Sequence, residues 1–170
     1  MAVLVLAGCQ QPGGWVARLL DPAGRPVTHA CGAIPWGVQP ANPADPMFRA
    51  NVISVIGQVS RLTGRQFTEV PYEQGHIRVT ESWPGTNTHP GYTSVRSDGW
   101  HFTVNTVYIN PRATQPNSRL RLGVMRHEIG HAMGLDHTTA DPSIMNPARY
   151  RDDYTAEIDI PALRELATRC

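Results

Sequence analysis

One stretch of eleven residues limits the possible fold more than any other, because it requires a helix that ends at a defined residue. It runs from His127 to His137 and reads HEIGHAMGLDH. Residues four apart on an α-helix lie on the same face, so His127 and His131 can direct two imidazoles at one point. Gly134 stands where a left-handed residue would end the helix and let the chain fold back. The stretch therefore predicts a helix, a sharp end and a third histidine that returns to the same point.

The residue types in this stretch predict a catalytic metal site. Three imidazoles with a fourth position left open are typical of catalytic zinc, whereas structural zinc sites have four protein ligands. We therefore expect His127, His131 and His137 to bind one Zn²⁺ ion. Glu128 would lie beside the metal as the catalytic residue, a general base for zinc-activated water. An amphipathic helix with surface histidines is the alternative, but it would not require Glu128, Gly134 and His137 together.

The stretch and the residues after it resemble the metzincin zinc peptidases, whose pattern is H-E-x-x-H-x-x-G-x-x-H followed by a Met-turn. Residues 143–147 read SIMNP and look like that turn. The resemblance implies that Met145 lies beneath the three imidazoles without binding the metal. Pro147 matches the matrixin pattern, so the chain is closest to matrixin-like bacterial members. The implied activity is that of a metalloendopeptidase.

The same resemblance suggests residues for the pocket that takes the residue after the scissile bond. Pro147, Tyr150 and Tyr154 are the candidates, and each tyrosine could instead be an ordinary packed side chain. Matrixins usually carry an aromatic or similar residue where this chain has Arg149, so the pocket preference stays open. Asp159 resembles the acidic residue that braces the Met-turn in matrixins. A solvated acid at the start of a helix is the alternative.

A second metal site is a further question raised by the sequence. His76, His89, Asp98 and His101 are loosely grouped, but they do not form the H-x-D cluster that holds a structural zinc in matrixins. We interpret them as surface or turn residues and keep a second zinc site as the alternative. Structural calcium is left open.

The hydrophobic pattern, read with the resemblance, predicts an α+β fold with a single metzincin-like catalytic domain. We expect a twisted, mostly parallel sheet of about five strands with an antiparallel edge strand, an active-site helix, a backing helix and a C-terminal helix. Strands are expected at residues 34–38, 67–70, 76–80, 92–95 and 102–109, after a hairpin within residues 15–27. Helices are expected at residues 46–63, from within 114–118 to 133, and at 158–167. Leu120, Val124 and Ile129 would point into the core. By resemblance, the strand at 92–95 would bind an extended substrate along its edge.

Length and charge bound the remaining possibilities. The chain of 170 residues fits one domain with a sizeable core. Its net charge of +1 comes with an even spread of arginines, so we expect a peptide or protein substrate and no nucleic-acid partner. We expect a signal-like or lipobox-like segment and tether at residues 1–14, a zinc metallopeptidase domain at 15–170, and a monomer.

The N-terminus resembles a bacterial lipoprotein signal, because residues 6–9 read LAGC. The resemblance implies a lipid on Cys9 and an extracellular or cell-surface location. The apolar run is too short to span a bilayer and has no positive start, so a plain apolar N-terminus is the alternative. If Cys9 is lipidated, Cys31 and Cys170 remain as a pair, and we expect a disulfide between them. Two free thiols are the alternative.

These inferences predict a zinc-dependent endopeptidase that hydrolyses peptide bonds with zinc-activated water and a glutamate base. The alternative is a catalytically inactive zinc-containing module that binds a peptide or protein without cutting it. Such a module would have little reason to keep Glu128.

Overall fold

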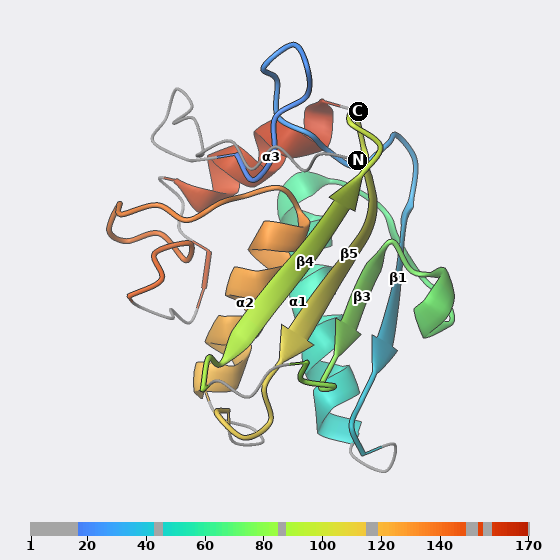
Figure 1. Ribbon diagram of the computed structural model, residues 1–170, viewed down its shortest axis with the longest axis vertical. Helices are drawn as coiled ribbons and strands as arrows, with labels where there is room; N and C mark the ends of the chain where they lie inside the picture. Colours follow the sequence, from blue (N-terminus) through green and yellow to red (C-terminus); the bar gives the residue numbers. More distant parts are fainter. Residues whose placement is uncertain are drawn as a thin grey trace.

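A five-stranded sheet forms the frame of the computed structural model, which describes residues 17–42, 46–84, 88–114, 119–148, 153–154 and 158–169 (Figure 1). The strands are β1 (Ile34–Gln39), β2 (Phe67–Glu69), β3 (Ile77–Thr80), β4 (Gly91–Ser97) and β5 (Phe102–Ile109). Their order in the sheet is β2-β1-β3-β5-β4. All neighbours are parallel except β4, which runs antiparallel to β5 at the edge. The predicted mostly parallel sheet with an antiparallel edge strand is confirmed.

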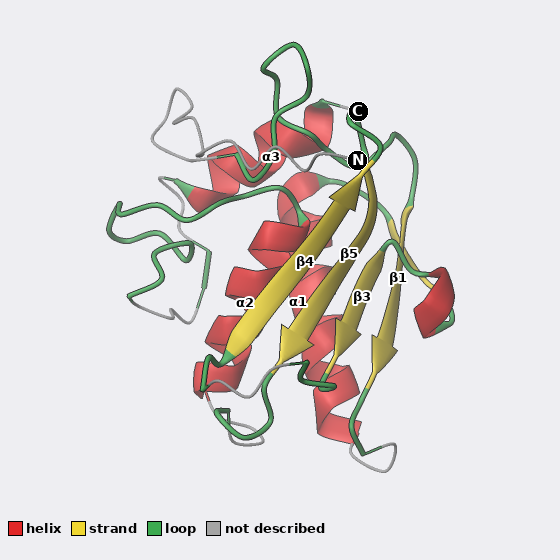
Figure 2. Cartoon of the chain, viewed as in Figure 1, coloured by secondary structure: helices red, strands yellow, loops and turns green. Residues whose placement is uncertain are grey.

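The described part of the chain contains three α-helices. Figure 2 shows how they lie relative to the sheet. They are α1 (Pro46–Thr63), α2 (Arg119–Ala132) and α3 (Asp159–Thr168), and a short 3₁₀ helix, η1 (Tyr72–Gln74), follows β2. Helices α1 and α2 lie behind the sheet in the view of Figure 1, and α2 contacts both β4 and β5. No helix in the described part of the chain is long and apolar enough to cross a membrane.

Helix α1 forms where its apolar residues recur at helical spacing. The buried side chains on its inner face include Phe48, Val52, Val55, Ile56 and Val59. The helix ends before Gly64, whose φ of +72° is a left-handed conformation that costs glycine little. The predicted helix at residues 46–63 is therefore confirmed at both ends.

Helix α2 corrects one expectation about the core. Leu120 is 42% exposed, whereas Arg121 beside it is only 1% exposed. The Arg121 guanidinium pairs with the buried Glu81 carboxylate and lies over the Phe48 ring, 5.1 Å from its centroid. The prediction for Leu120 was wrong because a partner carboxylate and a ring make burial of the arginine favourable. The other two predicted core residues, Val124 and Ile129, are fully buried.

The hairpin expected within residues 15–27 is present in its described part as a short one, in which the Asp21 N–H donates to the Arg25 carbonyl at 2.7 Å and the Val27 N–H donates to the Leu19 carbonyl at 2.9 Å. The Asp21 carboxylate accepts hydrogen bonds from the backbone N–H groups of Ala23 and Arg25, each at 2.8 Å. One isolated antiparallel bridge joins Leu20 to Pro26. Proline has no N–H to donate, which limits further pairing here.

Candidate metal centre

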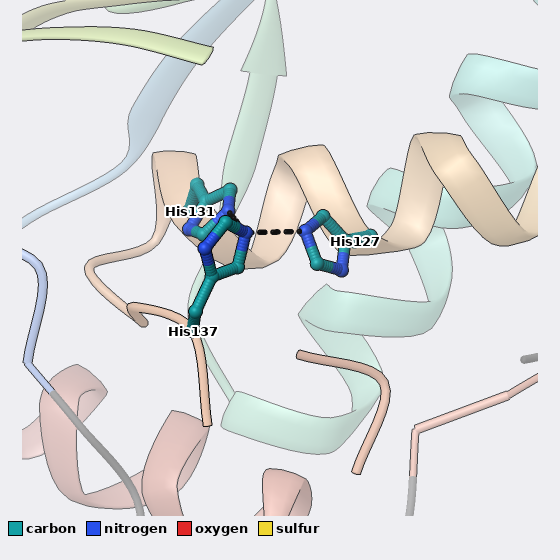
Figure 3. A group of neighbouring side chains, drawn as sticks. All are labelled: His127, His131 and His137. Carbon is teal, nitrogen blue, oxygen red and sulfur yellow. Dashed lines mark hydrogen bonds between the residues drawn. The ribbon is translucent and has the colours of Figure 1, made fainter. Parts of the chain in front are cut away.

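Three imidazoles meet at the C-terminal end of α2 (Figure 3). His127 and His131 project from successive turns of the helix, and His137 reaches them from the loop that follows. The His137 Nε2 atom lies 3.1 Å from the Nε2 atoms of both His127 and His131. Among the described histidines, cysteines and acidic residues, this is the one group of three placed to share a metal ion.

Gly134 turns the chain so that His137 can return. Its φ of +108° is left-handed, as predicted, and a Cβ atom there would lie 3.3 Å from both the Phe102 ring and the Val27 carbonyl oxygen. The Leu135 N–H donates to the carbonyl of Gly130 at 3.0 Å and closes the helix end. A side chain at position 134 would therefore meet both backbone strain and a lack of space.

Backbone carbonyls select the nitrogen that each helical histidine offers to a metal. The Nδ1 atom of His127 lies 2.8 Å from the carbonyl oxygen of Ile144, and that of His131 lies 2.7 Å from the carbonyl oxygen of Leu135. A carbonyl only accepts hydrogen bonds, so each Nδ1 carries the hydrogen and each Nε2 presents a lone pair. Lone pairs that converge in this way repel one another unless a cation lies between them.

The spacing and protonation of the three imidazoles fit a zinc ion. Tetrahedral Zn–N bonds of about 2.0–2.1 Å place ligand nitrogens about 3.3 Å apart, close to the 3.1 Å contacts here. Burial lowers the pKa of His127 to about 4 and that of His131 well below its usual value. Burial also lowers the pKa of His137, while Asp136 opposes this shift. The histidines are therefore neutral near pH 7, as metal binding requires.

Glu128 lies next to the first ligand and is only 4% exposed. Its carboxylate is held between α2 and β4, where the Thr93 hydroxyl lies 2.7 Å from Oε2. Burial raises the pKa of Glu128 to about 7, and the Thr93 hydrogen bond opposes that rise. The group can therefore both accept and release a proton near neutral pH.

The Met-turn packs directly against α2. Met145 is 2% exposed, and a Cβ atom added at Gly130 would lie 2.6 Å from the Met145 sulfur. Asp159, at the start of α3, accepts hydrogen bonds from the Ser143 hydroxyl at 2.5 Å and from the Ile144 N–H at 2.8 Å. The predicted contact between Asp159 and this turn is confirmed. The role of Met145 beneath the imidazoles stays a prediction.

The structure describes two of the three candidate pocket residues, Pro147 and Tyr154. Pro147 is exposed, and Tyr150 lies outside the described residues. Tyr154 is 5% exposed and donates its hydroxyl to the Arg126 carbonyl at 2.9 Å, so it packs against the helix that carries the ligands. Burial raises the pKa of Tyr154. The pocket assignment stays a prediction.

The four residues considered for a second metal site form no metal cluster in the described part of the chain. His76, His89 and Asp98 are exposed, and no group of three metal ligands within the described ranges contains any of the four. Asp98 accepts hydrogen bonds from the N–H groups of Trp100 and His101, which makes it a turn residue. Calcium binding stays open.

Two contacts at the site were not anticipated. The Arg18 guanidinium pairs with Asp136 at 2.8 Å, and the same Asp136 oxygen accepts the His137 N–H. No local pattern could reveal the Arg18 contact, because its partners are 118 residues apart. The sequence gives only a weak indication of the contact between Thr93 and Glu128. Side chains alternate along a strand, which places Thr93 on the opposite face of the sheet from Tyr92.

Comparison with known proteins gives one result for the family. The matrixin family model matches residues 45–163, which is more than half of the chain and includes all three histidines, Glu128 and Met145. A search of curated proteins found no match to the chain.

Proposed function

Because the chain belongs to the matrixin family, we propose that it is a zinc-dependent endopeptidase. One observation carries the proposal: three histidine Nε2 atoms converge beside a buried glutamate. The carbonyls of Ile144 and Leu135 already occupy the Nδ1 atoms of the helical histidines, so Nε2 is the nitrogen that each would offer to a metal.

Glu128 supplies the proton transfers of this reaction. A zinc ion held by the histidines would contribute Lewis acidity, which acidifies water and polarises a peptide carbonyl. Glu128 takes a proton from the attacking water while the oxygen of that water bonds to the carbonyl carbon of the peptide. The same carboxyl group then gives that proton to the leaving nitrogen as the C–N bond breaks. The raised pKa of Glu128 suits both transfers.

The free edge of strand β4 supports the proposal that the substrate is a peptide. The strand pairs with β5 on one side, and no described strand pairs with its other side. The backbone groups along a free edge can bind an extended peptide by strand addition, with little dependence on side chains. Thr93 contacts Glu128 from this strand, so a peptide bound along β4 would pass close to the general base.

Cleavage of casein and of a peptide library by the purified chain tests the proposal. We expect zinc-dependent hydrolysis that a chelator abolishes and added zinc restores. Glu128→Gln is the matched control, because it removes the base and keeps the side-chain shape. It should lower kcat by about 10²- to 10⁴-fold while zinc stays bound. An undiminished rate in this variant would exclude the mechanism, and peptide binding without cleavage by the wild type would indicate an inactive binding module.

We also propose that the protein acts outside the cytoplasm, attached to the cell surface through a lipid on Cys9. Cys31 is disulfide-bonded, which supports an oxidising compartment. Cys9 and Cys170 lie outside the described residues, so the pairing of Cys31 with Cys170 stays a prediction.

A further inference from the structure

The Thr93 hydroxyl contacts two acceptors that belong to one residue, Glu128. Its Oγ1 atom lies 2.7 Å from the Glu128 Oε2 atom and 2.9 Å from the Glu128 carbonyl oxygen. A threonine hydroxyl has one hydrogen, which these two acceptors can share. Because one acceptor is on the side chain and the other on the backbone, the contact favours one side-chain rotamer of Glu128.

Gly91 confines the same carboxylate from another side. Gly91 and Thr93 are two residues apart on β4, so both face α2. A Cβ atom at Gly91 would lie 2.7 Å from both Cγ and Oε1 of Glu128 and 2.6 Å from a Val124 methyl group. The Glu128 side chain therefore fills the space that the glycine leaves. One carboxylate oxygen faces Gly91, and the other faces the Thr93 hydroxyl.

Burial makes this hydrogen bond difficult to replace. Thr93 is 2% exposed and Glu128 is 4% exposed. If the hydroxyl were removed, little water could reach the carboxylate from this side and compensate. The carboxylate would keep its chemistry but would lose the contact that holds it.

We propose that Thr93 is a positioning residue, whose hydroxyl holds the Glu128 carboxylate in the rotamer that accepts the proton of the attacking water. This inference rests on the proposed peptidase function. Thr93 acts through Glu128, because both hydrogen-bond contacts of its hydroxyl group are with that residue. Its loss should therefore slow the chemical step and leave zinc binding unchanged.

Two substitutions separate the hydroxyl from the shape of the side chain. Thr93→Val keeps the branched shape without the hydroxyl, and we expect kcat to fall about 10- to 100-fold, the range for a hydrogen bond to a charged group. KM, zinc content and melting temperature should stay close to those of the wild type. Thr93→Ser keeps the hydroxyl and should retain kcat within about threefold. Thr106→Val is the matched control, because Thr106 lies on β5 beside the buried Asn105 and Val107 and faces away from α2.

Measuring the effect of Thr93→Val in the Glu128→Gln variant separates action through the base from a purely structural role. If Thr93 acts through the base, Thr93→Val should have little further effect on the residual rate of Glu128→Gln. An equal fold-loss in both backgrounds would overturn the proposal. So would a wild-type kcat in Thr93→Val, or a loss in Thr93→Ser as large as in Thr93→Val.

Folding and the proposed function are controlled separately. If Thr93→Val lowers the melting temperature, Thr93→Ser and Thr93→Ala replace it, because these two smaller side chains also differ by a hydroxyl group. Equal kcat values for these two variants would reject the role of the hydroxyl. An inactive, zinc-loaded wild type would overturn the peptidase function together with this inference. An active wild type with an equally active Thr93→Val would overturn the role of Thr93 alone.

Discussion

At the scale of single residues, backbone groups in the segments that follow α2 orient the three imidazoles of the candidate metal centre. The carbonyls of Ile144 and Leu135 hold the two helical imidazoles through Nδ1. Gly134 bends the chain so that His137 completes the group. Each contact is made by backbone atoms, so the ligand geometry depends on chain conformation more than on neighbouring side chains.

Gly134→Ala tests this dependence. The new side chain meets a left-handed φ and contacts of 3.3 Å, so the free energy of unfolding should fall by about 1–3 kcal/mol. Zinc affinity should weaken as His137 shifts. Gly24→Ala is the control, because Gly24 has a similar φ of +75° with nothing within 4 Å of the added carbon. Urea unfolding and zinc competition measure the two effects, and equal zinc affinity in both variants would contradict the expected displacement of His137.

At the scale of elements, α3 supports α2 through the Met-turn. Asp159 on α3 binds Ser143 and the Ile144 N–H, and the carbonyl of the same Ile144 binds His127. Helix α3 is thus linked by hydrogen bonds to His127 on α2.

Asp159→Ala should therefore destabilise the fold and weaken the site. It leaves two buried donors without their acceptor, which costs roughly 2–4 kcal/mol of unfolding free energy. Zinc affinity should fall about 10- to 100-fold, as for other residues that orient metal ligands. Glu165→Ala on the same helix is the control, because its ion pair with Arg169 is partly exposed and contributes about 0.5 kcal/mol. Equal unfolding curves for the two variants would rule out the proposed support.

At the scale of the whole molecule, the N-terminal part of the described chain joins segments that are distant in sequence. Arg18 pairs with Asp136 beside the third ligand. The Arg65 guanidinium donates to the carbonyls of Ala30, Gly32 and Ala167, which links the first loop, the end of α1 and the end of α3. These contacts connect the histidine site to segments at both ends of the described chain.

A buried histidine in this region makes the fold sensitive to acid. His29 lies 2.9 Å from the Ala132 carbonyl, and burial lowers its pKa from 6.5 to about 4. The unfolded chain binds the proton first as pH falls, so stability is complete above about pH 6.5 and is lost toward pH 4, by roughly 3 kcal/mol. His29→Gln keeps a donor to the carbonyl and should lose less stability over this range. The unfolding free energies of the wild type and of His29→Gln are measured at pH 7 and at pH 4.5. The wild type should lose more stability between the two pH values, and an equal loss in both proteins would refute the role of His29.

The disulfide of Cys31 is a second property of the whole molecule. We expect Cys170 to be its partner, which would stabilise the fold by roughly 4–5 kcal/mol through closure of a long loop. Alkylation followed by non-reducing proteolysis and mass spectrometry should find the two peptides linked, and Cys170→Ser should melt at a lower temperature. A link between Cys31 and Cys9 would disprove this pairing.

Local patterns were sufficient for much of the fold. The boundaries of α1 and β5 agree with those predicted, because apolar spacing and a terminal glycine act over a few residues. The three histidines lie together as their spacing requires, since helical geometry and one left-handed glycine place them. The outward position of Leu120 could not be predicted in this way, because Glu81 and Phe48 determine that Arg121 is buried instead.

The sequence by itself determined most of the elements and the grouping of three histidines beside Glu128, because each depends on residues that are neighbours along the chain. Only the tertiary structure decided which nitrogen His127 offers, what holds the Glu128 carboxylate, and what supports the loop of His137. These depend on Ile144, Thr93 and Arg18, which come from other parts of the chain. Such contacts exist only once the core has formed, since folding alone brings their partners within hydrogen-bond distance.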